Sequence, residues 1–509
     1  MPPAIAAAPD PLPVAPILSG VKVPPLTIDQ LNKSFLSGVV YYQALASLQA
    51  AQTGIAGQNG NDVSDARAGS SFVPQPSLSI MPDASIVSTV NVTNDDLQDV
   101  EPSVMSINVG GVDRTTSTYI KYVAPNPLTA RIQFASTTNF STFAGGQLSL
   151  PGGYSLTGDP LMAINPYTGG IAPTREYCSG IAFNSGNPGS TPNAVAVWHS
   201  DDGGASWSSP TIADSRGSGY FLDKPAIAVS WHTGSLGYVY VAYASWDYVS
   251  NNTAIVVARS TDGGASFAQK TVVAYGQGPT GLPLANPQIV VAPGTGYVYV
   301  IWVNFATNDI RMARSTDFGV SYGAHDVVAS GSLTRSSPAL NGGIRASTVP
   351  MARFNTPSNK IVVVWHENGS QGTDVKYAYK PCTSVCNSYG WEQKKLITQY
   401  TANDQFMPAL DFNASGNMVV TYYDRHSDSN NLLYRDYYSF INPTGTRLQN
   451  DQQISTFDSN PTTPQTFQGF IGDYKDIWDW AFSDGEKATA AWIGLPAKPG
   501  EVYLTRIAY

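Results

Sequence analysis

One eight-residue pattern recurs three times in the middle of this 509-residue chain. Each copy has the form S-x-D-x-G-x-x-[WFY] and follows a short apolar run typical of a β-strand. The defining residues are Ser200, Asp202, Gly204 and Trp207, then Ser260, Asp262, Gly264 and Phe267, and finally Ser315, Asp317, Gly319 and Tyr322. The three Asp residues lie 60 and 55 residues apart, a spacing that fits one small sheet per repeat. The pattern therefore predicts a repeat architecture made of β-sheets.

The residue types in the pattern suit a tight hairpin turn. An Asp carboxylate at this position can accept backbone N–H groups across the turn. Gly supplies a backbone angle that other residues resist, and the terminal aromatic ring can pack beneath the turn. We therefore expect these residues to stabilise hairpins and to take no part in catalysis.

A second repeat marks the beginning of each unit. An acidic or polar residue, often with a proline, precedes a strand at Glu101-Pro102, Asp159-Pro160, Asp223-Lys-Pro225, Asn286-Pro287, Val349-Pro350, Met407-Pro408 and Gly472-Asp473. The last unit ends after three strands, so its fourth strand must come from elsewhere, and the β-rich run at residues 86–92 is placed to supply it. The sequence thus predicts an all-β, seven-bladed propeller of four-stranded blades over residues 85–509. A six-bladed propeller is the alternative if the first unit is not a blade.

The first 84 residues form a separate N-terminal region. Residues 1–25 are rich in Pro and Ala and predict an extended arm, and residues 54–80 predict a linker rich in Gly, Asn and Ser. Between them, residues 27–52 predict an amphipathic helix, with apolar residues at steps of three and four along one face. That face packs either on the propeller or on another subunit, and in the second case the arm and helix would form a homo-oligomer.

Charge and cysteine content exclude several classes of protein. With 28 Lys and Arg against 37 Asp and Glu, the net charge of −9 argues against nucleic-acid binding. No run of 18 apolar residues predicts a membrane span, and the N-terminus lacks a signal-peptide pattern. The Ser-, Thr- and Tyr-rich, Lys-poor composition still favours an extracellular or cell-surface location. Cys382 and Cys386 are close enough for a local disulfide, while Cys178 is expected to be a buried free thiol.

The three copies of the pattern resemble the Asp-box, or bacterial neuraminidase repeat, of sialidase-like β-propellers. The segment Phe470-Ile-Gly-Asp-Tyr474 also resembles the last blade of bacterial members. The resemblance implies that each box joins the third and fourth strands of a blade, on the face away from the ligand. Sialidases bind the carboxylate of sialic acid with three Arg. They use a Tyr–Glu pair as nucleophile and an Asp as acid/base. Arg131-Ile132-Gln133 matches the family's R-I-P motif only in part. Sialidases usually have six blades, so the predicted seven blades also depart from the family.

The face opposite the boxes is where we expect chemistry, because aromatic rings beside carboxylates and Arg are typical of sugar sites. The catalytic candidates there are Glu367, Asp424 and Tyr474. The ligand-binding candidates are Trp246, Asp247, Trp302, Arg345, Arg353, Trp365, His366, Tyr423, Arg425 and Asp473. The alternative is that the aromatic residues belong to the blade cores and the acids cap strand ends. No cofactor is expected, although the acidic residues at the beginnings of the blades could bind Ca²⁺.

The sequence is compatible with three functions. The first, which we favour, is a non-catalytic extracellular propeller that binds a glycan or protein partner or forms part of a surface assembly. The second is a sialidase-type exo-glycosidase. The third is a structural subunit assembled through the N-terminal arm. Fold alone does not choose among them.

Overall fold

The computed structural model describes most of the region predicted to be the propeller and a small part of the N-terminal region. The described residues are 36, 40–42, 44, 45, 48 and 84–509, with gaps at 126–127, 166–173, 187, 278–282, 336–338, 383–389 and 393–394. The predicted arm, the predicted linker, most of the predicted helix, and Cys386 lie outside the described residues. Among the described residues, no helix is long and apolar enough to cross a membrane.

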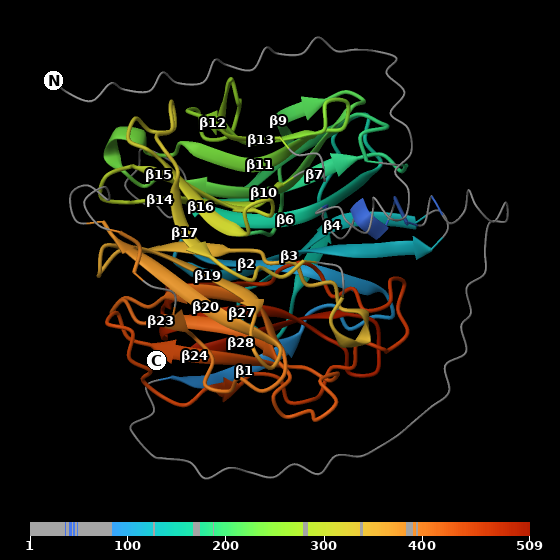
Figure 1. The fold of residues 1–509 in the computed structure, drawn as a ribbon, viewed down its shortest axis with the longest axis vertical. Coiled ribbons are helices and arrows are strands. Elements are labelled where there is room, and N and C mark those ends of the chain that lie inside the picture. The colour runs from blue at the N-terminus through green and yellow to red at the C-terminus, as the bar shows by residue number, and fades with distance from the viewer. Residues whose placement is uncertain are drawn as a thin grey trace.

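Seven four-stranded antiparallel sheets follow one another along the chain, which confirms the predicted seven-bladed propeller (Figure 1). Blade one contains β2 (Gln98–Val109), β3 (Val112–Pro125), β4 (Leu128–Thr137) and β5 (Ala144–Gln147). Blade two contains β6 (Leu156–Asn165), β7 (Arg175–Phe183), β8 (Asn193–Ser200) and β9 (Thr211–Arg216). Blade three contains β10 (Tyr220–Val229), β11 (Val239–Asp247), β12 (Asn252–Ser260) and β13 (Gln269–Gln277). Blade four contains β14 (Leu284–Val291), β15 (Val298–Asn304), β16 (Asp309–Ser315) and β17 (Asp326–Ser330).

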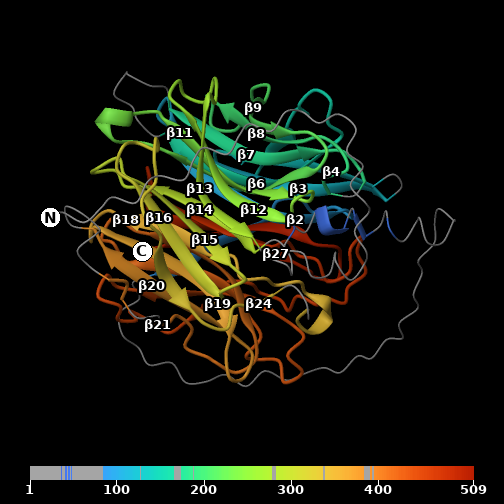
Figure 2. The same cartoon turned by 45° about the horizontal axis from the view of Figure 1, so that its top comes forward.

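The remaining blades complete the ring, and Figure 2 shows the green and yellow blades leading to the orange ones. Blade five contains β18 (Met351–Asn355), β19 (Lys360–Asn368), β20 (Thr373–Pro381) and β21 (Lys395–Leu396). Blade six contains β22 (Gln405–Phe412), β23 (Met418–Asp424), β24 (Arg435–Ile441) and β25 (Gln452–Gln453). Blade seven contains β26 (Asp476–Phe482), β27 (Gly485–Gly494), β28 (Glu501–Ala508) and β1 (Ser85–Asn91). Two single-turn 3₁₀ helices, η1 (Thr233–Ser235) and η2 (Asn341–Gly343), lie in loops.

The ring closes by pairing the two ends of the propeller, as the sequence predicted. Strand β1 is antiparallel to β28, from Ser85 opposite Ala508 to Asn91 opposite Tyr503 (Figure 1). The last blade therefore takes its outer strand from the beginning of the domain. This pairing covers the edge that β28 would otherwise leave open.

The three repeated turns join the third and fourth strands of blades two, three and four. In each of them the Ser hydroxyl donates to the Asp and accepts the backbone N–H of the second glycine position, at 2.6–2.8 Å. The carbonyl before that glycine accepts hydrogen bonds from the preceding blade. Tyr177, for example, donates its hydroxyl to the Gly263 carbonyl at 3.1 Å. The turns therefore stabilise hairpins and also connect neighbouring blades.

Candidate functional site

The first strand of each blade is its inner strand, next to the propeller axis. In five blades this strand contains the same backbone irregularity near its start. The strand register shifts there, and the residue before the proline has a positive φ of 48–55°. These residues are Glu101, Asp159, Lys224, Asn286 and Met407, and all of them are buried. Since the inner strands surround the propeller axis, this bulge brings side chains from separate blades to one end of the central channel. We call this end, opposite the repeated turns, the channel mouth.

A buried ion cluster crosses the channel mouth. The Lys224 ammonium pairs with the Asp473 carboxylate, which also accepts two N–H groups of Arg345 at 3.1 and 3.3 Å. Lys224 belongs to blade three, whereas Asp473 immediately precedes blade seven. The backbone N–H of Asp473 donates to Glu101 at 3.1 Å, so blade one joins the same network. Buried ions need such partners, because an unpaired charge there would be costly.

Glu101 and Asp159 both belong to this cluster, and the charge of each carboxyl group acts on the pKa of the other. Burial raises the pKa of Glu101 to about 7, despite the attraction of Lys224. Burial, reinforced by the charge of Glu101, raises the pKa of Asp159 well above its ordinary value. A nearby like charge disfavours the ionised form of each carboxyl group and so acts in the same direction as burial. The Tyr474 hydroxyl donates to the Pro160 carbonyl at 2.9 Å beside this pair.

Part of the N-terminal region covers the channel mouth. Leu36, Val40 and Ala44 are 0–2% exposed and belong to the hydrophobic core of the propeller. Arg345 donates to the Leu36 carbonyl, and its guanidinium lies 4.9 Å from the centre of the Tyr41 ring. The Tyr42 ring stacks on Phe467 at 4.7 Å. The described residues from 40 to 48 are helical (blue in Figure 1).

The three arginines considered for gripping a ligand carboxylate do not converge. Arg345 binds Asp473, Arg353 binds Asp476 at 3.0 Å, and Arg425 binds Asp404 at 3.2 Å. Arg425 is fully buried. It also donates to the backbone carbonyls of Asn341 and Asn431, at 2.8 and 3.0 Å, so it fixes loops. In the part of the chain that the structure describes, a three-arginine carboxylate site is not formed.

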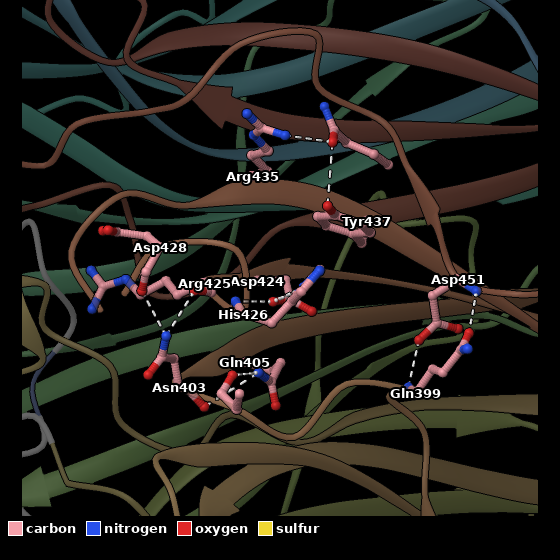
Figure 3. Close-up of polar contacts among 12 residues, drawn as sticks. Gln399, Asn403, Gln405, Asp424, Arg425, His426, Asp428, Arg435, Tyr437 and Asp451 are labelled. Atoms are coloured by element: carbon pink, nitrogen blue, oxygen red, sulfur yellow. Dashed lines mark hydrogen bonds and ion pairs between the residues drawn. The ribbon is translucent and has the colours of Figure 1, made fainter. Parts of the chain in front are cut away.

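A second polar group lies in the loop after β23 in blade six (Figure 3). Asp424 is buried, and one of its oxygens lies 2.7 Å from Nδ1 of His426 and accepts the His426 backbone N–H at 2.6 Å. Burial raises the pKa of Asp424, although hydrogen bonds from His426 act in the opposite direction. The carboxylate fixes the orientation of the imidazole ring, as carboxylates do in many sites.

Aromatic rings enclose this imidazole. Tyr400 stacks on His426 with centroids 4.0 Å apart, and Tyr437 meets it edge-on at 5.2 Å. The His426 side chain keeps 19% of its surface exposed. Beside it, Arg435 and Tyr437, both labelled in Figure 3, donate to the Gln453 side chain at 2.8 and 3.3 Å. We refer to Tyr400, His426, Arg435 and Tyr437 as the blade-six rim.

Four of the predicted ligand-stacking residues prove to be core residues. Trp246, Trp302 and Trp365 are 0% exposed, and Tyr423 is 1% exposed. Their side chains fill the blade interiors, and Trp365 donates its indole N–H to Glu367 at 3.0 Å. The prediction that they stack on a ligand is therefore wrong for this conformation, and the alternative of blade-core packing holds.

The other predicted residues are divided among separate places. His366 is buried between blades five and six, and burial lowers its pKa to about 4. Asp247 accepts the backbone N–H groups of Val249 and Ser250 in its own loop. Asp473, Tyr474 and Arg345 meet at the channel mouth, whereas Asp424 and Arg425 lie in blade six. Lys224 and Tyr400 were not predicted from the sequence as site residues. For Lys224 a signal was available, because it directly precedes the proline that marks the beginning of its unit.

Among the described residues, no group of three or more His, Cys, Asp or Glu side chains has a geometry that could hold a metal ion.

No protein-family model matches this chain, and no curated protein matches it. Its fold is similar to that of sialidases and GH93 arabinofuranosidases of known structure. The Hadza microbial sialidase Hz136 is 14% identical, with a TM-score of 0.44 over 65% of this chain and 64% of that one. The α-L-arabinofuranosidase Arb93A from Fusarium graminearum is 11% identical, with a TM-score of 0.46 over 83% and 98%. Trypanosoma rangeli sialidase is 11% identical, with a TM-score of 0.42 over 84% and 60%. This chain thus spans less than two thirds of either sialidase, and the likeness concerns the fold alone.

Proposed function

We propose that this chain is a non-catalytic, extracellular propeller that binds a glycan through the blade-six rim. One observation carries the proposal: the rim combines a carboxylate-held imidazole with two tyrosine rings and an arginine at a partly exposed position. Aromatic faces can stack on a sugar ring, while imidazole and guanidinium groups can bind its hydroxyls.

The state of the channel mouth favours binding over hydrolysis. A glycosidase needs two carboxyl groups that reach the substrate from opposite sides of the scissile bond. At the mouth, Glu101, Asp159 and Asp473 are 0–2% exposed. The Asp473 carboxylate is bound to Lys224 and Arg345, and the Asp473 backbone N–H donates to Glu101. The N-terminal residues lie over them as well. The carboxyl groups at the channel mouth therefore stabilise the folded propeller in the described structure.

Cysteine chemistry supports the proposed location. Cys382 is disulfide-bonded, and Cys178 is a buried free thiol. Stable disulfides are common in secreted proteins and rare in reducing compartments. An extracellular location is therefore part of the proposal.

Glycan binding tests this function. Soluble oligosaccharides of varied composition should be titrated into the full-length protein by calorimetry. Replacing Tyr400 with Ala should weaken binding by about two- to tenfold, since stacking of one ring contributes about 0.5–1.5 kcal/mol. Tyr275→Ala is the matched control, because Tyr275 is a 47% exposed tyrosine on the outer strand of blade three. Equal affinity in Tyr400→Ala, or no glycan binding at all, would remove the blade-six rim as the site.

A further inference from the structure

The arginine of the blade-six rim is already paired with a carboxylate of the protein. Arg435 donates its Nε–H to Asp458 and a second N–H to the Gln453 side-chain oxygen at 2.8 Å. Burial lowers the pKa of Arg435, but the hydrogen bond and the charge of Asp458 outweigh burial and raise it. The guanidinium is therefore committed to Asp458 before any ligand arrives.

The other charges next to the rim add to this balance. Arg447, which interacts electrostatically with Tyr400, forms an ion pair with Asp451. Asp424 holds the imidazole of the rim, and among the described residues no Lys or Arg lies within ion-pairing distance of it. The rim and its immediate neighbours thus carry three carboxylates, from Asp424, Asp451 and Asp458, but two guanidinium groups.

The most exposed of these charges is negative. The Asp458 side chain keeps 40% of its surface exposed, compared with 18% for Arg435 and 26% for Arg447. Asp424 and Asp451 are buried. A ligand that approaches the rim therefore meets the Asp458 carboxylate at the surface. A carboxylate on the ligand would be repelled there, because like charges brought together at an interface are unfavourable.

The imidazole of His426 also suits an uncharged ligand. Its Nδ1 lies 2.7 Å from the ionised Asp424 carboxylate, which can accept but not donate, so Nδ1 carries the ring hydrogen (Figure 3). In the neutral ring Nε2 then has a lone pair and no hydrogen, and no described residue donates to it. Such a nitrogen can accept a hydrogen bond from a sugar hydroxyl, whereas an ionised carboxylate has no hydrogen to donate.

We propose that the blade-six rim selects neutral sugars over sugars that carry a carboxylate, and that Asp458 determines this selectivity. The inference rests on the proposed glycan-binding function and narrows its ligand to one chemical class. Asp458 acts through Arg435 and is a positioning residue. By holding the guanidinium, it keeps Arg435 from making the paired, parallel hydrogen bonds with which an arginine binds a ligand carboxylate.

Paired glycans test the selectivity. A glycan array that presents each neutral oligosaccharide beside its sialylated and its glucuronic-acid-capped counterpart is probed with the labelled full-length protein. The pair with the tightest-binding neutral member is then titrated by calorimetry. We expect the neutral member to bind about tenfold more tightly than its acidic counterpart, because of the like-charge repulsion at Asp458. Added salt should reduce the difference, since it screens exposed charges.

Variants of Asp458 test its role in the selectivity. Asp458→Asn should raise the affinity for the acidic member several-fold, because Arg435 is released, and should change the affinity for the neutral member little. Asp458→Glu keeps the charge and should keep the selectivity of the native protein. Asp201→Asn is the matched control, because Asp201 pairs with Arg175 in blade two at similar side-chain exposures of 50% and 18%. The control should change neither affinity.

Failure of this inference and failure of the proposed function give different results. If the acidic member binds as tightly as the neutral one and Tyr400→Ala weakens both, the rim remains a glycan site and its selectivity is overturned. An unchanged ratio of the two affinities in Asp458→Asn would overturn the role of Asp458. No binding to any glycan on the array would remove the proposed function itself, and this inference with it.

Discussion

At the residue scale, Asp262 shows how one side chain holds a hairpin turn. One carboxylate oxygen accepts the Ser266 backbone N–H at 2.9 Å, and the other accepts the Ser266 hydroxyl at 2.6 Å. The Ser260 hydroxyl donates to the same carboxylate at 2.6 Å and accepts the Gly264 N–H at 2.8 Å. A positive φ of 85° at Gly264 lets the chain turn at this point. Asp202 and Asp317 repeat these contacts in blades two and four.

We predict that Asp262→Ala lowers the free energy of unfolding by about 1–2 kcal/mol, the cost of losing hydrogen bonds to a carboxylate. Denaturation by urea measures this change. Asp96→Ala is the control, because the Asp96 side chain is 93% exposed and lies 3.8 Å from its Lys498 partner. A change in Asp262→Ala no larger than the control's would show that the carboxylate is dispensable.

The same turns make stability depend on pH. Partial burial alone would raise the pKa of Asp262, but hydrogen bonds from Ser260 and Ser266 outweigh it and lower the pKa. A depressed pKa in the folded state contributes stability that is present above the unfolded pKa of about 3.9. That contribution is lost as pH falls through the lower, folded pKa. The destabilisation caused by Asp262→Ala should therefore shrink in acid.

At the element scale, β1 is the strand that closes the ring. It pairs with β28 over its length, and the Thr89 and Thr505 hydroxyls are 2.9 Å apart across the pair. The other blades are continuous in sequence, so blade seven alone depends on joining distant parts of the chain. Closure of this kind removes a free sheet edge that could pair with another molecule.

Proline substitutions test the closure. In an antiparallel ladder, alternate residues direct their N–H toward the partner strand, so one of Thr89→Pro and Val90→Pro must lose a hydrogen bond to β28. That variant should lose about 1–3 kcal/mol of stability in a denaturant titration, and the other should lose less. Equal and negligible effects from both would argue against the pairing of β1 with β28.

The elements were the part of the structure that the sequence predicted well. The Asp–Gly–aromatic repeat and the unit-start prolines gave seven blades, and the count of strands in the last unit indicated the closing strand. The aromatic residues were harder to assign, because an aromatic residue near the end of a blade's second strand suits a blade core and a ligand site equally. Trp246 and Trp365 lie in the core, and only the packing of the complete sheet decides that.

At the scale of the whole molecule, the ring brings together residues that are distant along the chain. Lys224 and Asp473 are 249 residues apart and form an ion pair across the channel mouth. No local motif could predict such a pair, because it depends on the number of blades and on the bulge within the inner strands of five of them. Arg345, which belongs to the same cluster, also donates to the Leu36 carbonyl.

Hydrolysis of glycosides tests the central claim, that this propeller binds and does not catalyse. Release of a fluorogenic aglycone from sialosides and from neutral glycosides should be measured with the full-length protein. We predict no turnover above the uncatalysed rate, because the buried Asp473 carboxylate at the mouth is bound to Lys224 and Arg345. Turnover that disappears in Glu367→Gln or Asp424→Asn would contradict the account and show that the protein is a glycosidase.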